Sequence, residues 1–127
     1  MAIVKKMKQH PPLPPSRYEV GIYCRVSTAS KTQVVSIGHQ LFGLIADVAN
    51  SQQARLYDVY LDIQSGRTSD NRKNLMRLLD DCRAGRGTLV YTKSISRFAR
   101  NTVDVLTIVR ELKKVNVPVY FENEQLY

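Results

Sequence analysis

Short apolar runs alternate with longer amphipathic segments along most of this chain. The runs predict four strands, at 18–24, 55–62, 88–92 and 117–122. Between them, apolar residues recur every three or four positions, which predicts helices at 33–50, 72–84 and 101 to about 115. The second of these helices shows the pattern most clearly, because Leu75, Leu78, Leu79 and Cys82 fall on one of its faces.

This order of elements is typical of an α/β fold. Strands that alternate with helices through short connections pair mainly in parallel, and the helices then cover the sheet. We therefore predict a three-layer domain with a mainly parallel central sheet of four or five strands and helices on both faces. The crossovers between strands should be right-handed.

Residues 1–16 differ from the rest of the chain. They hold three lysines and four of the five prolines, a composition that favours an extended or flexible leader. A single domain over 17–127 follows, because that length suits one compact core and not two. Within it, Asn101 is a good helix N-cap with Asp104 near the positive end of the helix dipole, and Gly85 ends the preceding helix.

The chain is strongly basic, with 19 Lys and Arg against 11 Asp and Glu and a formal net charge of +8. This charge favours a polyanionic partner, with nucleic acid first, although a solvated basic face gives the same composition. No apolar run approaches the roughly 20 residues that a membrane-spanning helix needs. Cys24 and Cys82 lie inside predicted elements, lack metal-site spacing, and are expected to be buried free thiols in a reducing compartment.

A serine and several arginines cluster where predicted strands end. Arg25 and Ser27 are two residues apart, so on an extended strand their side chains leave the same face. Arg97 and Arg100 follow the third strand, and Arg72 opens the second helix. Because the carboxyl ends of parallel strands share one edge, we expect these residues at one rim of the sheet.

Arginines gathered at one rim suit phosphate, which a guanidinium binds through two parallel hydrogen bonds. Phosphoryl transfer requires stabilisation of the non-bridging oxygens, and Asp58, Asp62 and Asp70 form no evident carboxylate cage for a metal there. This set of residues favours transfer of a phosphoryl group to a serine hydroxyl without a metal. The alternative from spacing alone is that the arginines form ion pairs with Asp62, Asp70 and Asp104.

Two motifs resemble the N-terminal catalytic domain of serine recombinases, and most closely the large members of that family. They are Tyr23-Cys24-Arg25-Val26-Ser27 and Ser94-Ile95-Ser96-Arg97-Phe98-Ala99-Arg100-Asn101. The resemblance covers residues 18 to 124 and implies that Ser27 is the nucleophile. It also implies that four arginines bind the phosphate, namely Arg25, Arg72, Arg97 and Arg100.

Supporting roles follow from the same resemblance for Gln33, Gln40, Ser65 and Ser96. Resolvases usually carry an aspartate where this chain has Ser96, a departure that agrees with the large subgroup. His39 is a single histidine on a helix surface position, so we expect it to be solvated rather than a general base.

The resemblance implies site-specific DNA recombination, in which the serine forms a covalent 5′-phosphoserine link without metal, cofactor or ATP. It implies double-stranded DNA as partner, a homodimer or tetramer of the full-length protein, and a cytoplasmic location in a bacterium, encoded by the host or a phage. Because family members continue with a long helix and DNA-binding domains, we expect the chain to be part of a longer protein. The alternatives are a non-catalytic accessory module that binds DNA or a recombinase, and a nucleotide-binding domain, against which the missing P-loop pattern argues.

Overall fold

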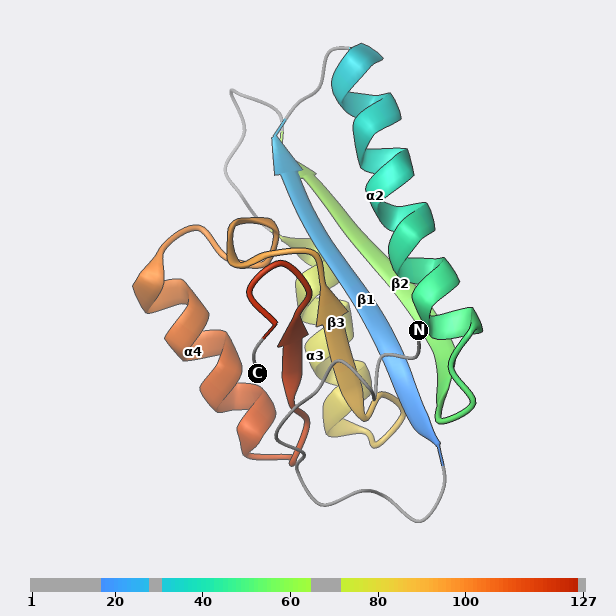
Figure 1. Cartoon of the computed structure of the whole chain (residues 1–127). Coiled ribbons are helices and arrows are strands. Elements are labelled where there is room, and N and C mark those ends of the chain that lie inside the picture. The colour runs from blue at the N-terminus through green and yellow to red at the C-terminus, as the bar shows by residue number, and fades with distance from the viewer. Residues whose placement is uncertain (1–16, 28–30, 65–71, 126–127) are drawn as a thin grey trace.

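Four parallel strands form the central sheet of the computed structural model, which describes residues 17–27, 31–64 and 72–125 (Figure 1). They are β1 (Tyr18–Ser27), β2 (Ala54–Gln64), β3 (Leu89–Thr92) and β4 (Val119–Phe121). The strand order is β2-β1-β3-β4, and each neighbouring pair is parallel. The side chains at 27, 31–34 and 64 and the predicted leader at 1–16 lie outside the described part, so the division into leader and domain stays a prediction.

Helices cover both faces of this sheet. Helix α2 (Lys31–Ala49) lies on one face, and α3 (Lys73–Arg83) and α4 (Thr102–Lys113) lie on the other (Figure 1). A short 3-10 helix, η1 (Ile95–Arg97), connects β3 to α4. The prediction of a three-layer α/β domain with a parallel sheet is therefore confirmed.

The two faces of the sheet form two apolar cores, because side chains alternate along each strand. Toward α3 and α4 the sheet presents Tyr23, Tyr60, Val90 and Phe121. Toward α2 it presents a second set of buried residues, among them Val20, Ile22, Tyr91 and Tyr120. Near the end of β1, Cys24 and Val26 pack beside Ile37 of α2. Arg25 lies between these two positions in the chain, on the face shared with Tyr23.

The ends of the elements follow local signals in most places. Asn101 caps α4 as predicted, because its side-chain oxygen accepts a hydrogen bond from the backbone N–H of Asp104 at 2.9 Å. Gly85 has a φ of +80°, a left-handed conformation that glycine adopts without strain just after a helix. Strand β1 continues three residues beyond the predicted end and reaches Ser27. Helix α3 begins at Lys73, one residue later than predicted, and Arg72 precedes it.

Helix α3 packs closely on β1 at Gly21. A Cβ at this position would lie 2.8 Å from Leu78 Cδ1 and 3.1 Å from the Tyr60 ring. Only glycine therefore allows the helix to approach the strand at this distance. By contrast, a Cβ at Gly38 in α2 would meet no atom within 4 Å, so packing does not explain that glycine.

Both cysteines, Cys24 and Cys82, are buried and free, as predicted. Across the described ranges, no helix combines the length and apolar character needed to cross a membrane.

Candidate active site

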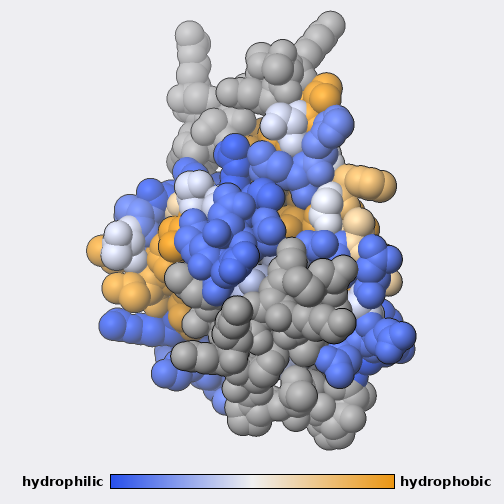
Figure 2. Space-filling view, in the orientation of Figure 1, coloured by the Kyte–Doolittle hydropathy of each residue, from blue (hydrophilic) through white to orange (hydrophobic). Residues whose placement is uncertain are grey.

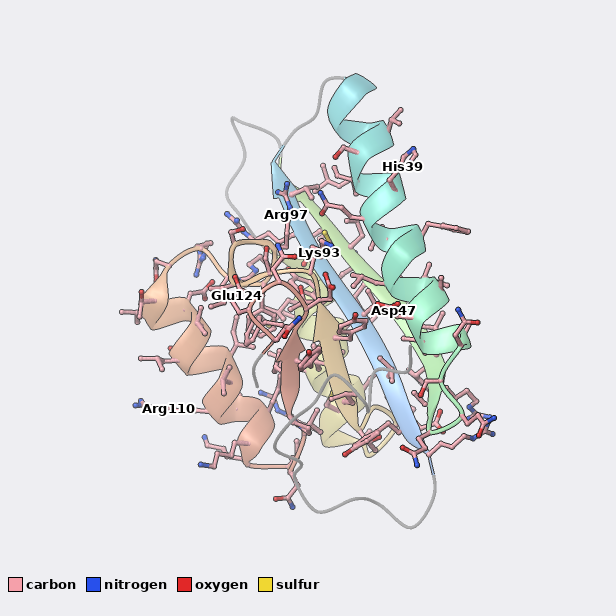
Figure 3. The ribbon with its side chains drawn as sticks, in the orientation of Figure 1. His39, Asp47, Lys93, Arg97, Arg110 and Glu124 are labelled. Carbon is pink, nitrogen blue, oxygen red and sulfur yellow. The ribbon has the colours of Figure 1, made fainter. Side chains whose placement is uncertain are left out.

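Three of the predicted site residues with described side chains belong to the segments where β1 ends and where the chain leaves β3, namely Arg25, Arg97 and Arg100. Strand β1 lies between β2 and β3, so its carboxyl end is next to the segment that leaves β3. Arg25 is paired in register with Asp62 of β2, and Ser27, the last residue of β1, with Gln64. In Figure 3, Arg97 lies beside the carboxyl-terminal part of β1, above Lys93 and Glu124. The side chain of Ser27 itself lies outside the described residues.

Arg72 is buried beneath this rim. Its side chain is 4% exposed, and the guanidinium donates hydrogen bonds to three different elements. Nε donates to the Tyr23 hydroxyl at 3.3 Å, and one terminal nitrogen donates to Asp104 Oδ2 at 2.5 Å. The other terminal nitrogen donates to the backbone carbonyl of Phe98, between Arg97 and Arg100 in the chain. Arg72 thus ties the beginning of α3 to β1, to α4 and to the turn after β3.

Tyr23 and Asp62 form the base of this network. The Tyr23 hydroxyl donates to Asp62 Oδ2 at 2.8 Å and receives the bond from Arg72. Burial raises the pKa of Tyr23 well above its usual value, although the hydrogen bond and charge of Arg72 oppose this effect. The hydroxyl therefore keeps its proton at any physiological pH and acts as a fixed donor to Asp62.

Asp62 also caps α3. Its two carboxylate oxygens accept hydrogen bonds from the backbone N–H groups of Asn74 and Leu75, at 2.9 and 3.0 Å. These groups have no partner within the helix, and a negative charge is favourable at a helix N-terminus. Arg72 stands at the N-cap position without a side-chain cap bond and has a left-handed backbone, with φ 49° and ψ 50°. A residue from β2 therefore does the capping that the residue before the helix does not.

Asp104 holds two of the predicted phosphate-binding arginines. Besides the ion pair with Arg72, it accepts a hydrogen bond from the Arg100 backbone N–H at 2.8 Å, and the Arg100 guanidinium lies 3.4 Å away. Burial alone would raise the pKa of Asp104. The hydrogen bonds from Arg100 and the charges of both arginines outweigh burial and lower that pKa below its usual value.

The charge of Arg97 acts on a different residue. Burial raises the pKa of the Cys24 thiol, and the charge of Arg97 opposes that rise. Arg97 therefore lies within electrostatic range of Cys24, whose side chain packs on the α2 face of the sheet. The structure brings Arg72 and Arg100 together at Asp104, whereas Arg97 lies at the end of β1.

The turn after β3 is rigidly held. Ser94 is 8% exposed and caps η1, since its Oγ accepts a hydrogen bond from the Arg97 backbone N–H. Ser96 Oγ lies 3.1 Å from Ser94 Oγ. Phe98 is fully buried, with its ring against Tyr23 and Phe121. The arginines on either side of Phe98 therefore start from a backbone that the core fixes in place.

The remaining predicted site residues are further from this network. Gln40 is half-buried on α2, on the other side of the sheet, and its Oε1 atom is buried without a hydrogen-bond donor among the described residues. Ser65 and the side chain of Gln33 lie outside the described part. His39 is exposed and points away from the sheet (Figure 3). Over the described ranges, no cluster of His, Cys, Asp or Glu has the arrangement of a metal site.

Sequence reasoning missed the hydrogen bonds of the Tyr23 hydroxyl and the capping of α3 by Asp62. It placed Asp104 near the helix dipole and, in the alternative interpretation, among the ion-pair partners of the arginines. The alternative in which arginines pair with acidic residues is confirmed for Asp104, which pairs with Arg72 and Arg100. Asp70 lies outside the described residues.

Comparison with known proteins identifies one family and several structures with the same fold. Residues 20–127 match the family model described as the resolvase N-terminal domain. No curated protein matches the chain. The N-terminal catalytic domain of TP901-1 integrase is 25% identical, with a TM-score of 0.73 over 84% of this chain and 79% of that one.

Two further solved structures share the fold. A resolvase-family site-specific recombinase from Streptococcus pneumoniae is 24% identical, with a TM-score of 0.72 over 86% of this chain and 74% of that one. The C-terminal catalytic domain of ISC1926 TnpA, an IS607-like serine recombinase, is 21% identical, with a TM-score of 0.68 over 82% and 68%.

Proposed function

Since this chain belongs to the resolvase N-terminal domain family, we propose that it cleaves and rejoins DNA strands with Ser27 as the nucleophile. The family match and the recombinase structures support site-specific recombination in general terms. The covalent chemistry and the residue roles are the proposal. We also propose that residues 17–127 form the catalytic domain, and that double-stranded DNA and further copies of the full-length protein are its partners.

One observation carries this assignment. Arg25 and Ser27 end β1, and β1 pairs directly with β3, whose following turn carries Arg97 and Arg100. The residues that carry one hydroxyl and three guanidinium groups therefore belong to adjacent segments, which supports a site at the edge where parallel sheets bind ligands. Such a set suits a phosphodiester, because guanidinium groups stabilise the charge that develops on its non-bridging oxygens.

The proposed reaction exchanges one ester for another. The Ser27 hydroxyl oxygen bonds to phosphorus, and the bond between phosphorus and the 3′ oxygen breaks. The proton from serine ends on the released 3′-hydroxyl, and the 5′ phosphate stays on the protein. The reverse attack by a 3′-hydroxyl restores the DNA and frees the serine, so no ATP is consumed. Arg25, Arg72, Arg97 and Arg100 hold the phosphate, with Gln33, Gln40, Ser65 and Ser96 in support.

Covalent capture tests the nucleophile. The protein is incubated with a pool of random-sequence DNA duplexes, and adducts are resolved under denaturing conditions and mapped by mass spectrometry. We expect a nucleotide remnant on the peptide that contains Ser27, and no adduct with Ser27→Ala. Ser36→Ala is the matched control, because Ser36 is exposed on α2 and should leave the adduct unchanged. An adduct that persists in Ser27→Ala would refute the assignment, and DNA binding without any adduct would favour the accessory-module alternative.

A further inference from the structure

A single carboxylate neutralises two of the four arginines that the proposed function assigns to phosphate. Asp104 forms an ion pair with buried Arg72 at 2.5 Å and a weaker pair with Arg100 at 3.4 Å. The side chains of Arg72 and Asp104 are 4% and 10% exposed, so this pair forms largely out of water, whereas the Arg100 side chain is 48% exposed. In water the same contacts would be screened and worth little.

We propose that Asp104 is a positioning residue that competes with the DNA phosphate for Arg72 and Arg100. This inference rests on the proposed function. In the described conformation the carboxylate oxygens take the place on the guanidinium groups that phosphate oxygens would occupy, since both anions bind guanidinium in the same geometry. DNA binding at the rim then requires that Arg72 exchange Asp104 for phosphate.

The burial of Arg72 supports a movement of this kind. The Arg72 side chain is 4% exposed, and its guanidinium donates to the Phe98 carbonyl and lies over the Tyr23 ring, so it does not reach a phosphate outside the protein. Because the core holds the turn around Phe98 in place, Arg72 must move outward to reach one. This movement breaks the Arg72–Asp104 pair, so the strength of that pair sets how readily the arginine becomes available.

The local backbone permits Arg72 to move without loss of α3. Arg72 has a left-handed φ of 49°, a strained conformation for a residue with a side chain. Asp62, and not Arg72, caps the first turn of α3. Movement of the Arg72 side chain therefore leaves the cap of α3 in place.

A purely structural role explains the Arg72–Asp104 pair less well. The desolvation penalty of a buried ion pair offsets most of its attraction, so apolar residues of similar size would give comparable stability. The pKa of Asp104 is lowered by its partners, so the carboxylate stays charged at neutral pH. Only a competing anion, and not a modest fall in pH, would then displace it.

The test compares two variants that remove the same charge. Asp104→Asn removes the proposed competitor, whereas Asp58→Asn removes a half-exposed carboxylate that pairs with Arg77, away from the rim. Both changes are made in a Ser27→Ala background, so that cleavage does not intervene. Binding of a short random-sequence DNA duplex is followed by fluorescence anisotropy as a function of salt concentration.

Release of two arginines should strengthen binding and its dependence on salt. We expect Asp104→Asn to bind about tenfold more tightly than Asp58→Asn. The slope of the logarithm of the binding constant against the logarithm of the salt concentration should be steeper by roughly one to two units, because each new phosphate contact adds about 0.9. The double variant Asp104→Asn/Arg72→Gln should keep only the part of the gain that comes from Arg100, and its salt slope should fall by about 0.9 relative to Asp104→Asn. A merely structural role for Asp104 would not steepen the slope. Equal or weaker binding by a folded Asp104→Asn protein would overturn the proposal.

A measurement on the unsubstituted protein covers the case in which Asp104→Asn does not fold. Nitrogen-15 NMR of the arginine side chains reports how fast the Arg72 Nε–H exchanges with water. We expect slow exchange in the free protein and faster exchange when the duplex is bound. An Arg72 signal that stays unchanged while the signal of Arg97 shifts would refute the proposal. Neither the anisotropy nor the NMR measurement depends on covalent capture. If they overturn the role of Asp104, the assignment of Ser27 as nucleophile stands, and if covalent capture fails, the role of Asp104 can still be tested.

Discussion

The hydroxyl of Tyr23 donates a hydrogen bond to Asp62 at 2.8 Å, and this bond joins β1 to the residue that caps α3. The same hydroxyl accepts from Arg72, so one phenol oxygen connects the cap to the arginine network. The arrangement links the stability of α3 to the position of the arginines. It therefore predicts that removal of one oxygen atom affects both.

Tyr23→Phe removes this oxygen and leaves the Nε–H of Arg72 without its acceptor. Because an unsatisfied buried donor costs about 1–3 kcal/mol, we expect the free energy of unfolding to fall by that amount. Urea denaturation measures the loss. Tyr91→Phe is the matched control, since its hydroxyl bonds to Asp47 at 2.7 Å on the α2 side of the sheet. Both variants should lose stability, but only Tyr23→Phe should change DNA binding, and equal DNA binding by the two would contradict the link.

The sequence predicted the layers well and the network poorly, for a physical reason. Apolar spacing is a local signal, since each strand or helix must bury one face, and it located every strand and all three long helices. The network instead joins residues that are distant in the chain: Tyr23 and Arg72 are separated by 49 positions, and Arg72 and Asp104 by 32. Such contacts depend on the packed fold, which no local spacing reports.

Two local features also escaped prediction. Helix η1 has only three residues, which is too short to show a repeating apolar face. The cap of α3 comes from Asp62 on the preceding strand, whereas capping signals in sequences are read from the residue next to the helix. The sequence also places apolar side chains in solvent, because Val103 and Leu106 of α4 are exposed. Figure 2 shows that hydrophobic and hydrophilic residues are mixed on this face of the molecule.

Acid should weaken the fold through Asp104. The pKa of this carboxyl is lower in the folded protein than its value of about 3.9 in an unfolded chain, so it adds stability above that unfolded value. The contribution is lost as the pH falls through the lower folded pKa. We expect the stability difference between the unsubstituted protein and Asp104→Asn to be full near pH 6 and to shrink below about pH 4.

Urea denaturation at a series of pH values measures this difference. Asp80→Asn is the control for loss of one charge, because the Asp80 side chain is 73% exposed and its contact with Arg83 is long, at 3.4 Å. The interpretation fails if Asp104→Asn and the unsubstituted protein lose stability in parallel down to about pH 2.5, well below the unfolded pKa of about 3.9.

The two thiols should resist alkylation in the folded protein. Burial raises the pKa of Cys82 to about 12, with a smaller contribution from the charge of Asp81, and burial also raises the pKa of Cys24. Only the thiolate reacts, so at pH 8 Cys82 should react roughly 10³-fold more slowly than an exposed cysteine, even before access is considered. Iodoacetamide labelling followed by mass spectrometry measures both rates, with and without urea. Rapid labelling of Cys82 without urea would show that α3 opens readily.

Glycine-to-alanine changes at two positions should have opposite effects on stability. At Gly21 the new methyl group would lie 2.8 Å from Leu78 Cδ1 in a packed interface, so α3 must shift or Leu78 must change its rotamer. Overpacking of this kind costs about 1–3 kcal/mol. At Gly38 the methyl group meets no atom within 4 Å, and alanine in a helix interior is favoured over glycine by about 1 kcal/mol. Thermal denaturation of both variants should therefore show a lower melting temperature for Gly21→Ala and a higher one for Gly38→Ala. If Gly38→Ala is instead destabilised, the open surface of α2 at this position must be in contact with something in solution, because neither helix propensity nor the packing of the described residues accounts for a loss.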